Sequence, residues 1–320
     1  MEALYSSLKE KIYKYNIKKN SISSLFIGGG TPSVVEANMY EAIFNFLKPY
    51  MAENIEITTE ANPNSATKKW LEGMFSLGVN RVSFGVQSFN DKKLKELNRA
   101  HSSKDAILAV ENAYNIGFKN ISIDIIYDFY SDTKELILSD LKQAFKLPIN
   151  HISSYELTIE KATEFTKRPE VKKNSENLGF ILRDYILKRG FKQYEVSNYG
   201  AYQSSHNLGY WQHKEYLGIG AGAVGFIANK RLYTHTNIEK FIKEPYFVKE
   251  EILSSEDILT EKIFLGLRSI VGVEQNILPK KMQEKADILV NEKKLEFKNK
   301  HYYNKEFFLA DELALFIISY

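Results

Sequence analysis

Short β-rich runs alternate with segments of helical period between Ser24 and about Thr158. The runs are SLFIGGG, IEITTEA, RVSFGVQ, ISIDIIY and HISSYELT, and each is followed by a helix-like stretch. A strand about every 30 residues with a helix between is typical of βαβ units, so we predict parallel strands. Periodicity does not give the strand order, so the pattern is compatible with both an open sheet and a barrel. In either fold, chemistry belongs at the C-terminal ends of the strands.

Capping residues mark the ends of two predicted helices. Thr67 precedes KKWLEGMFSLG, which closes at Gly78, and Ser103 precedes KDAILAVENAYNIG, which closes at Gly117. A hydroxyl before the first turn and a glycine after the last are favoured because both help to satisfy the free backbone groups of helix ends.

The alternation stops after about Phe226, where a more charged segment begins. We therefore divide the chain into residues 1–228, which hold the core, and residues 229–320, a smaller C-terminal domain. Helices are predicted near 255–267 and 275–292, followed by two β-like pieces, KLEFKN and HYYNK, and a final helix. This pattern predicts an α/β module of winged-helix type.

Composition narrows the function classes. The 320 residues carry 43 Lys and Arg against 40 Asp and Glu, a net charge of +3 that argues against an extended nucleic-acid surface. The lysine pairs at 68–69 and 92–93 are predicted to lie on exposed helix faces.

The sequence has no apolar run of membrane length, and it starts with a charged amphipathic helix, so we expect a cytoplasmic protein. With no cysteine, the chain has no thiolate of its own for an iron–sulfur cluster.

Polar side chains follow successive predicted strands. The turn GGGTPS occupies residues 28–33, and Glu60, Gln87, Arg99 and Asp124 belong to the next βα units. Acceptors and donors on one rim suit a polar, zwitterionic ligand with hydroxyl groups. A merely structural turn, a surface cap at Glu60 and an ion pair between Asp124 and Arg99 remain as alternatives.

Here the sequence resembles a known family. GGGTPS, EANP, GVNRVSFGVQSFND, LNRAHS and IDIIY are similar, in order and spacing, to radical S-adenosylmethionine (SAM) enzymes of the oxygen-independent coproporphyrinogen III oxidase group. The resemblance covers essentially the whole chain. It implies an α/β fold, a partial (β/α)6 radical SAM barrel that lacks its first strand, with the small C-terminal domain. Gly29, Gly30 and Thr31 would touch SAM, Glu60 its ribose and amino-acid region, and Gln87, Arg99 and Asp124 a second SAM or the substrate.

A second motif separates two branches of that family. HNLGYW at 206–211 matches the HNxxYW motif of the heme-chaperone branch, which the oxidases lack. The resemblance implies heme contacts for His206, Asn207, Tyr210 and Trp211. The imidazole would face iron, and the aromatic rings would lie against the porphyrin. The family's usual histidine in the following GAGAHG segment is Val224 here, so the axial ligand set differs if that histidine contributes.

Two further departures from the family stand out. DFYSD at 128–132 replaces the usual Gly-Leu-Pro after the Asp-containing strand, so we expect this loop to be reshaped beside Asp124. The CxxxCxxC loop for the 4Fe-4S cluster is missing, and MEALYSSLKEKI resembles the helix that normally follows it. Either the start was placed at an internal methionine of a longer gene, which we favour, or the protein is a shortened paralog.

Three functions therefore compete. The sequence favours a heme chaperone that binds heme and SAM and transfers heme to apo-hemoproteins. The alternatives are an oxygen-independent coproporphyrinogen III oxidase, whose radical chemistry needs the cluster, and a truncated, inactive binding protein. The heme recipient, the oligomeric state and transient membrane contact are left open.

Overall fold

The fold is described from a computed structural model, which covers residues 1–159 and 164–319. Contacts group the chain into two compact units, here called the sheet unit and the terminal unit. The sheet unit comprises Ser24–Glu41 and Ile55–Gln203, and the terminal unit comprises Met1–Ser23, Ala42–Asn54 and Ser204–Tyr320. The boundary placed after residue 228 stays a prediction.

A seven-stranded sheet organises the first part of the chain. Its order is β1-β2-β3-β4-β5-β7-β6. The strands are β1 (Ile22–Ile27), β2 (Met51–Ala61), β3 (Arg81–Gln87), β4 (Asn120–Tyr127), β5 (His151–Glu156), β6 (Lys192–Gln193) and β7 (Asn198–Gly200). Strands β2 to β5 pair in parallel, and β7 pairs antiparallel with both β5 and β6. An open flavodoxin-like sheet would insert β1 between β2 and β3, so the sequential order confirms the barrel-type radical SAM sheet.

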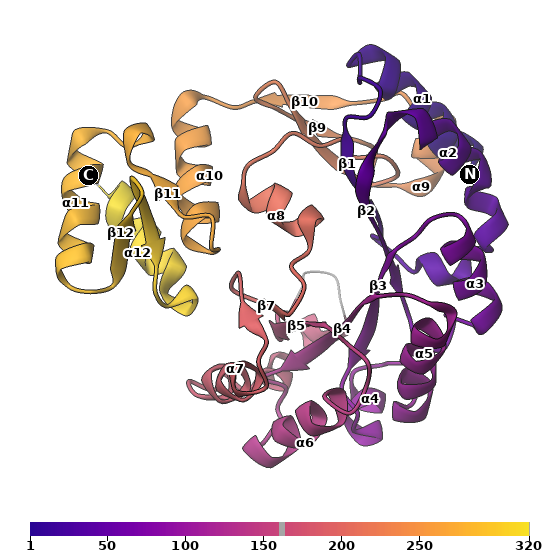
Figure 1. Cartoon of the computed structure of the whole chain (residues 1–320), viewed down its shortest axis with the longest axis horizontal. Coiled ribbons are helices and arrows are strands. Elements are labelled where there is room, and N and C mark those ends of the chain that lie inside the picture. The colour runs from indigo at the N-terminus through magenta and orange to yellow at the C-terminus, as the bar shows by residue number, and fades with distance from the viewer. Residues whose placement is uncertain (160–163, 320) are drawn as a thin grey trace. The chain divides into compact units, whose positions relative to one another are not determined.

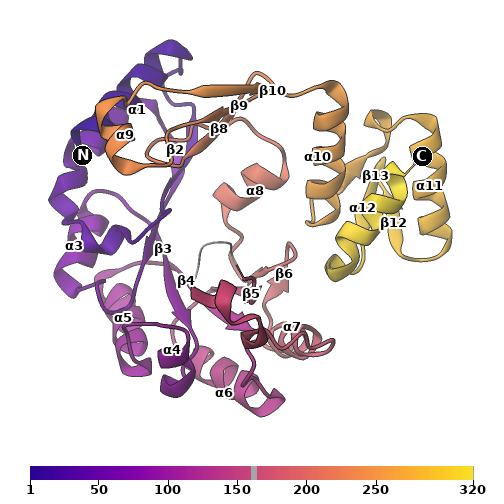
Figure 2. The same cartoon turned by 180° about the vertical axis from the view of Figure 1, so that it is seen from behind.

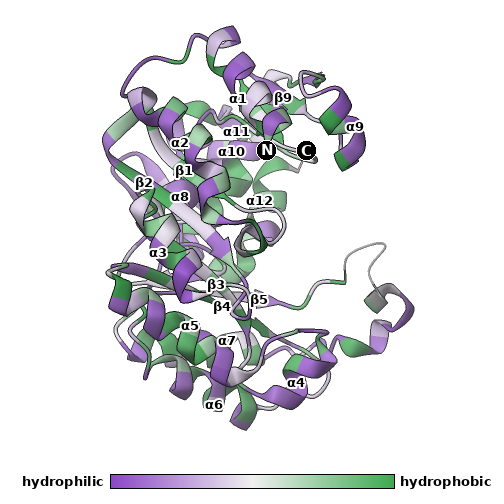
Figure 3. Cartoon of the chain, turned by 90° about the vertical axis from the view of Figure 1, so that its right-hand side faces the viewer, coloured by the Kyte–Doolittle hydropathy of each residue, from purple (hydrophilic) through white to green (hydrophobic). Residues whose placement is uncertain are grey.

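Helices of the sheet unit lie on one face of this sheet (Figures 1 and 2). They are α3 (Lys68–Ser76), α4 (Asp91–Glu96), α5 (Ser103–Ile116), α6 (Lys134–Ala144) and α7 (Leu178–Lys188). Figure 3 shows hydrophobic and hydrophilic residues on the same helices, as expected where one stripe packs on a sheet. The buried stripe includes Met74, Val110 and Leu141, each with none of its surface exposed.

The predicted helix ends are confirmed to within one residue. Thr67 caps α3 by accepting a hydrogen bond from the backbone N–H of Trp70 at 3.2 Å. The cap of α5 is Ser102, one residue earlier than predicted, and it forms a reciprocal capping box with Asp105. Gly117 closes this helix at φ +118°.

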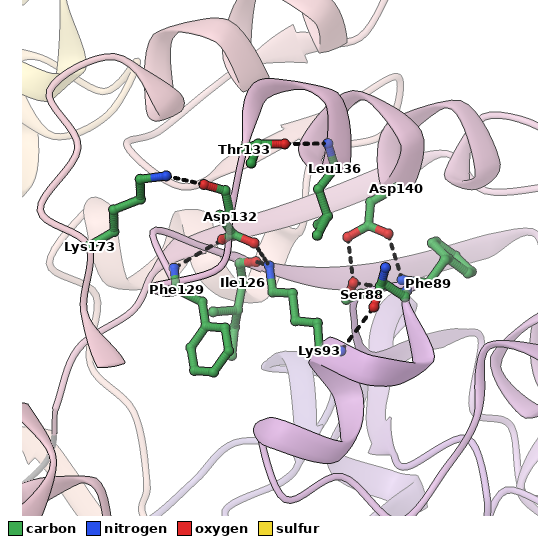
Figure 4. A network of polar contacts seen from close by, with 11 residues as sticks. Ser88, Phe89, Lys93, Ile126, Phe129, Asp132, Thr133, Leu136, Asp140 and Lys173 are labelled. Carbon is green, nitrogen blue, oxygen red and sulfur yellow. Dashed lines mark hydrogen bonds and ion pairs between the residues drawn. The ribbon is translucent and has the colours of Figure 1, made fainter. Parts of the chain in front are cut away.

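Lys93 is buried, so the predicted exposure of the second lysine pair is wrong at this position. Its side chain is 1% exposed, and Nζ lies 2.7 Å from Asp132 Oδ1 and donates to the Ile126 carbonyl at 2.7 Å (Figure 4). Nearby, Asp140 accepts from Ser88 Oγ at 2.6 Å and from the Phe89 N–H. A buried ammonium requires such partners because an unpaired charge is costly away from water.

The same network fixes the loop at residues 128–132. Asp128 adopts φ +70°, and its carboxylate accepts from the backbone N–H groups of Asn174 and Ser175. Lys173 Nζ donates to the Asp132 carbonyl (Figure 4). The segment that departs from the family pattern is therefore tied to residues 171–175.

The terminal unit contains helices from both ends of the chain. Its first elements are α1 (Glu2–Lys14), α2 (Glu41–Leu47, which begins one residue before the unit), α8 (Ser205–Trp211), β8 (Val224–Ile227), β9 (Lys230–Tyr233), α9 (Ile238–Lys243) and β10 (Lys249–Ile252). Lys11 of α1 is buried and donates to the Gly218 carbonyl at 2.6 Å. Burial lowers the pKa of Lys11 to about 8.

The last third of the terminal unit has a core of its own. It consists of α10 (Ser255–Leu267), β11 (Val273–Glu274), α11 (Lys280–Asn291), β12 (Leu295–Lys298), β13 (His301–Asn304) and α12 (Ala310–Ile318). The three strands form a sheet of order β11-β13-β12. Leu267, Leu289 and Tyr302 belong to one buried cluster. The predicted small α/β module is confirmed, although its middle helix starts only after Pro279.

The structure also bears on membrane insertion. Within residues 1–159 and 164–319, no helix is long and apolar enough to cross a bilayer.

Candidate functional site

The glycine turn after β1 exposes backbone at the C-terminal end of the sheet. A Cβ added to Gly28 would lie 2.4 Å from the Phe26 ring and 2.7 Å from Glu60 Oε2, so only glycine fits there. Gly29 adopts φ +83°, and its N–H donates to Glu60 Oε2 at 3.2 Å. A Cβ on Gly29 or Gly30 would meet no atom within 4 Å. The turn therefore offers open backbone to a ligand.

Asn62 connects this turn with Arg99. Its amide donates to Thr31 Oγ1 at 3.3 Å and accepts from Arg99 Nη2 at 2.9 Å. Arg99 also donates to the Gly85 carbonyl at 3.2 Å, while its Nε is buried without a hydrogen-bond partner. Sequence reasoning did not single out Asn62, although it stands within the EANP segment. One guanidinium donor thus remains for a ligand.

Gln87 ends β3 in a strained conformation. Its φ of +68° lies in the left-handed region, which residues other than glycine rarely adopt. Gln87 Oε1 is buried and has no hydrogen-bond partner. A Cβ at Gly85 would lie 3.1 Å from both Arg99 Nη2 and Gln87 Nε2, so glycine there leaves room for both side chains. Strain beside an unsatisfied acceptor is typical of a functional site.

Asp124 accepts from Ser83 Oγ at 3.2 Å on the neighbouring strand. Burial raises the pKa of Asp124 to about 6, although Ser153 donates a hydrogen bond to its carboxylate, and the negative charge of Glu60 raises that pKa further. Burial also raises the pKa of Glu60. Among the described contacts, Asp124 forms hydrogen bonds with the two serines and no direct ion pair with Arg99. The structure therefore brings Glu60, Gln87, Arg99 and Asp124 to one rim.

Two cavities lie in the sheet unit. A cavity of about 190 Å³ reaches the rim and is lined by residues that include Thr31, Asn62 and Arg99. A larger one of about 600 Å³ lies between residues 33–41 and α3 and contains none of the predicted site residues. Of these two cavities we assign the smaller to the candidate site, because its lining includes residues of the polar cluster and that of the larger does not.

A second candidate site lies on α8 in the terminal unit. Ser204 caps this helix by accepting from the Asn207 N–H at 3.3 Å, and the helix contains no buried residue. His206 and Tyr210 are one turn apart, with Nε2 and the phenol oxygen 3.1 Å apart and the rings edge to face at 4.8 Å. The ring of Tyr216, which sequence reasoning missed, packs against Tyr210 at 4.7 Å. A loop residue outside the motif carries no spacing signal.

Two features of α8 leave room and bonding capacity for a flat ligand. The Trp211 indole N–H is buried and has no hydrogen-bond partner. A Cβ added to Gly209 would meet only Lys214 Cδ, at 4.0 Å. Burial raises the pKa of Tyr210, so its hydroxyl stays protonated near neutral pH. Val224, at the position where the family resemblance suggests a histidine, is half-buried and pairs with Tyr233.

The three groups that the resemblance implies fit this chain differently. The rim offers unsatisfied donor and acceptor atoms together with open backbone, which fit SAM. The α8 surface offers an imidazole, an orphan indole N–H and an open face, which fit heme as cargo. The 4Fe-4S cluster does not fit, because the sequence has no cysteine and the described residues form no His, Asp and Glu group able to hold a metal.

Comparison with known proteins gives the family. Residues 5–144 match the Radical SAM superfamily. The chain is 34% identical over 288 residues to the heme chaperone HemW of Lactococcus lactis, covering 85% of this chain and 75% of that protein. For HemW of Haemophilus influenzae the identity is 39% over 220 residues, 67% of this chain and 57% of the relative's length. The fold is similar to that of coproporphyrinogen III oxidase (HemN) of Escherichia coli, with a TM-score of 0.81 at 16% identity over all of this chain and 82% of that one. This chain belongs to the HemW heme-chaperone family within the radical SAM superfamily.

Proposed function

We propose that this chain binds heme as cargo on α8 and passes it to apo-hemoproteins, with SAM held at the rim of the sheet. The observation that carries the heme assignment is the α8 surface itself. An imidazole, an exposed phenol and an unsatisfied indole N–H lie within six residues of a helix in which no residue is fully buried. Side chains that are not fully buried can be presented to a ligand.

Four residues of α8 have distinct parts in this proposal. His206 supplies the nitrogen for iron, since a neutral imidazole is a common axial ligand. Tyr210 offers a flat ring that is 39% exposed. The Trp211 N–H supplies a donor for a polar edge group such as a propionate. Asn207 holds the first turn through its backbone N–H to Ser204.

We propose that SAM binds at the rim and is not cleaved there by this chain. The negatively charged Glu60 and Asp124 would attract its cationic groups, and Arg99 Nε would donate to its carboxylate. When bound beside a reduced cluster, SAM supplies radical chemistry, which side chains cannot initiate. This chain has no cysteine to hold that cluster, so the proposal includes neither a radical step nor the oxidation of coproporphyrinogen.

Hemin titration tests the assignment. We expect a saturable, shifted Soret band for the wild type, and its loss or displacement in His206→Ala. His301→Ala is the matched control, because His301 lies on β13 in the C-terminal module, where its Nδ1–H donates to the Asn299 carbonyl at 3.0 Å. Equal loss in both variants, or an unshifted band in the wild type, would sink the heme assignment.

A parallel calorimetric titration with SAM separates the remaining alternatives. Binding that is lost in Arg99→Ala supports the rim site. If neither hemin nor SAM binds, the chain is an inactive member of its family.

A further inference from the structure

The nitrogen that would bind iron already has a partner. His206 Nε2 and the Tyr210 hydroxyl are 3.1 Å apart, and the two residues stand four positions apart on α8. Residues at this spacing lie on one face of a helix, so the contact follows from the sequence spacing itself. Iron coordination at Nε2 and this hydrogen bond exclude each other.

The exclusion holds for both tautomers of the imidazole. With the proton on Nδ1, the Nε2 lone pair accepts from the phenol, and iron would need the same lone pair. With the proton on Nε2, the nitrogen has no lone pair to offer until the proton moves to Nδ1. Loading therefore breaks one hydrogen bond and forms one Fe–N bond, and no electron is transferred.

Tyr210 is placed so that it can leave and return. Its side chain is 39% exposed, and its ring touches His206 and Tyr216 edge to face, at 4.8 and 4.7 Å. No residue of α8 is buried. A rotation of the phenol therefore breaks ring contacts with two half-buried residues and displaces no fully buried residue of α8.

We propose that Tyr210 is a positioning residue that competes with heme iron for His206 Nε2 and thereby sets how tightly the cargo is held. This inference rests on the proposed heme binding at α8. A carrier must release what it binds, and an internal competitor one turn away weakens binding and recaptures the imidazole when iron departs. The residue acts through His206 and not as a ligand.

Tyr210→Phe tests the competition, because it removes the hydroxyl and keeps the ring. A net hydrogen bond of about 0.5–1.5 kcal/mol corresponds to a two- to tenfold change in affinity, so hemin should bind the variant two- to tenfold more tightly. Transfer of hemin to apomyoglobin should slow by a similar factor. The Soret position should equal that of the wild type, since His206 remains.

Tyr303→Phe is the matched control. It removes a phenol hydroxyl from β13 in the C-terminal module and leaves the His206–Tyr210 contact intact, so hemin affinity should stay at the wild-type value. Circular dichroism verifies that both variants fold.

The outcomes are separable from those of the proposed function. If the wild type binds hemin and loses it in His206→Ala, an unchanged or weaker affinity of Tyr210→Phe overturns the competition while heme binding stands. A displaced Soret band in Tyr210→Phe would mean that Tyr210 is itself a ligand, which also overturns it. If the wild type and Tyr210→Phe both fail to bind, both proposals fall.

Discussion

The pKa of Asp124 makes the stability of the protein depend on pH. Burial raises its pKa from 3.8 to about 6, so the folded protein holds the proton more tightly than the unfolded chain does. The stabilisation from the protonated form is complete below about pH 4 and is lost as the pH rises through 6. At neutral pH the ionised carboxylate is a cost to stability that a cationic ligand would offset.

Asp124→Asn is therefore expected to remove part of the pH dependence of unfolding. One pKa unit corresponds to about 1.4 kcal/mol. The free energy of unfolding of the variant, relative to that of the wild type, should therefore be higher at pH 7.5 than at pH 4 by roughly 3 kcal/mol at most. Urea denaturation at these two pH values measures the difference.

Asp105 provides a control of opposite sign. Hydrogen bonds from Ser102 lower the pKa of Asp105 at the cap of α5, so its stabilisation is present at neutral pH and is lost as the pH falls. Asp105→Asn should lose stability at neutral pH, and this loss should diminish only as the pH falls below 3.8, the ordinary pKa of the group. If both variants changed in the same direction, the assignment of the Asp124 pKa would be wrong.

Elements differ in how well a sequence predicts them. Strands β2 to β5 follow from their apolar runs because each contains fully buried positions. The run that predicts β1 has only half-buried and exposed residues in the fold. The burial of Lys93 could not be predicted, since its partner Asp132 lies 39 positions away in a loop without periodicity (Figure 4). Likewise, the rim residues follow from strand ends, but the roles of Asn62 and Ser83 depend on contacts that only the folded sheet creates. The face of α8 is an exception, because spacing alone places His206 beside Tyr210.

Gly209, in the middle of α8, is expected to lower the stability of the helix and to leave space for the ligand. Replacing Gly209 by Ala favours the helix by about 0.5–1 kcal/mol, and the open space at its Cβ imposes no clash within the protein. The methyl group would stand one turn from His206, where it obstructs a flat ligand. A steric cost of about 1–3 kcal/mol corresponds to a loss of hemin affinity of about five- to 150-fold.

Two measurements on Gly209→Ala must therefore move in opposite directions. Urea denaturation should show equal or higher stability, and hemin titration should show weaker binding. Unchanged hemin affinity would place the ligand on another face of α8.

At the scale of the whole molecule, the C-terminal module has a core that is separate from the sheet. Leu289 is 2% exposed within that core, whereas its neighbour Ile288 on the same helix is 47% exposed. Leu289→Ala should cost about 2–5 kcal/mol of unfolding free energy and produce an early thermal transition of the module. Ile288→Ala should stay within about 0.5 kcal/mol of the wild type. Calorimetry of the full chain decides, and equal effects of the two substitutions would contradict a separate core.

The strand order has a consequence for synthesis on the ribosome. From β1 to β5 each new strand pairs with the one made just before it, so the sheet can grow as the chain emerges. The terminal unit cannot, because it joins residues 1–23 to residues after 204. The ammonium of Lys11 cannot donate to the Gly218 carbonyl until a residue 207 positions later has been made, so α1 completes its contacts only after the whole sheet has been synthesised.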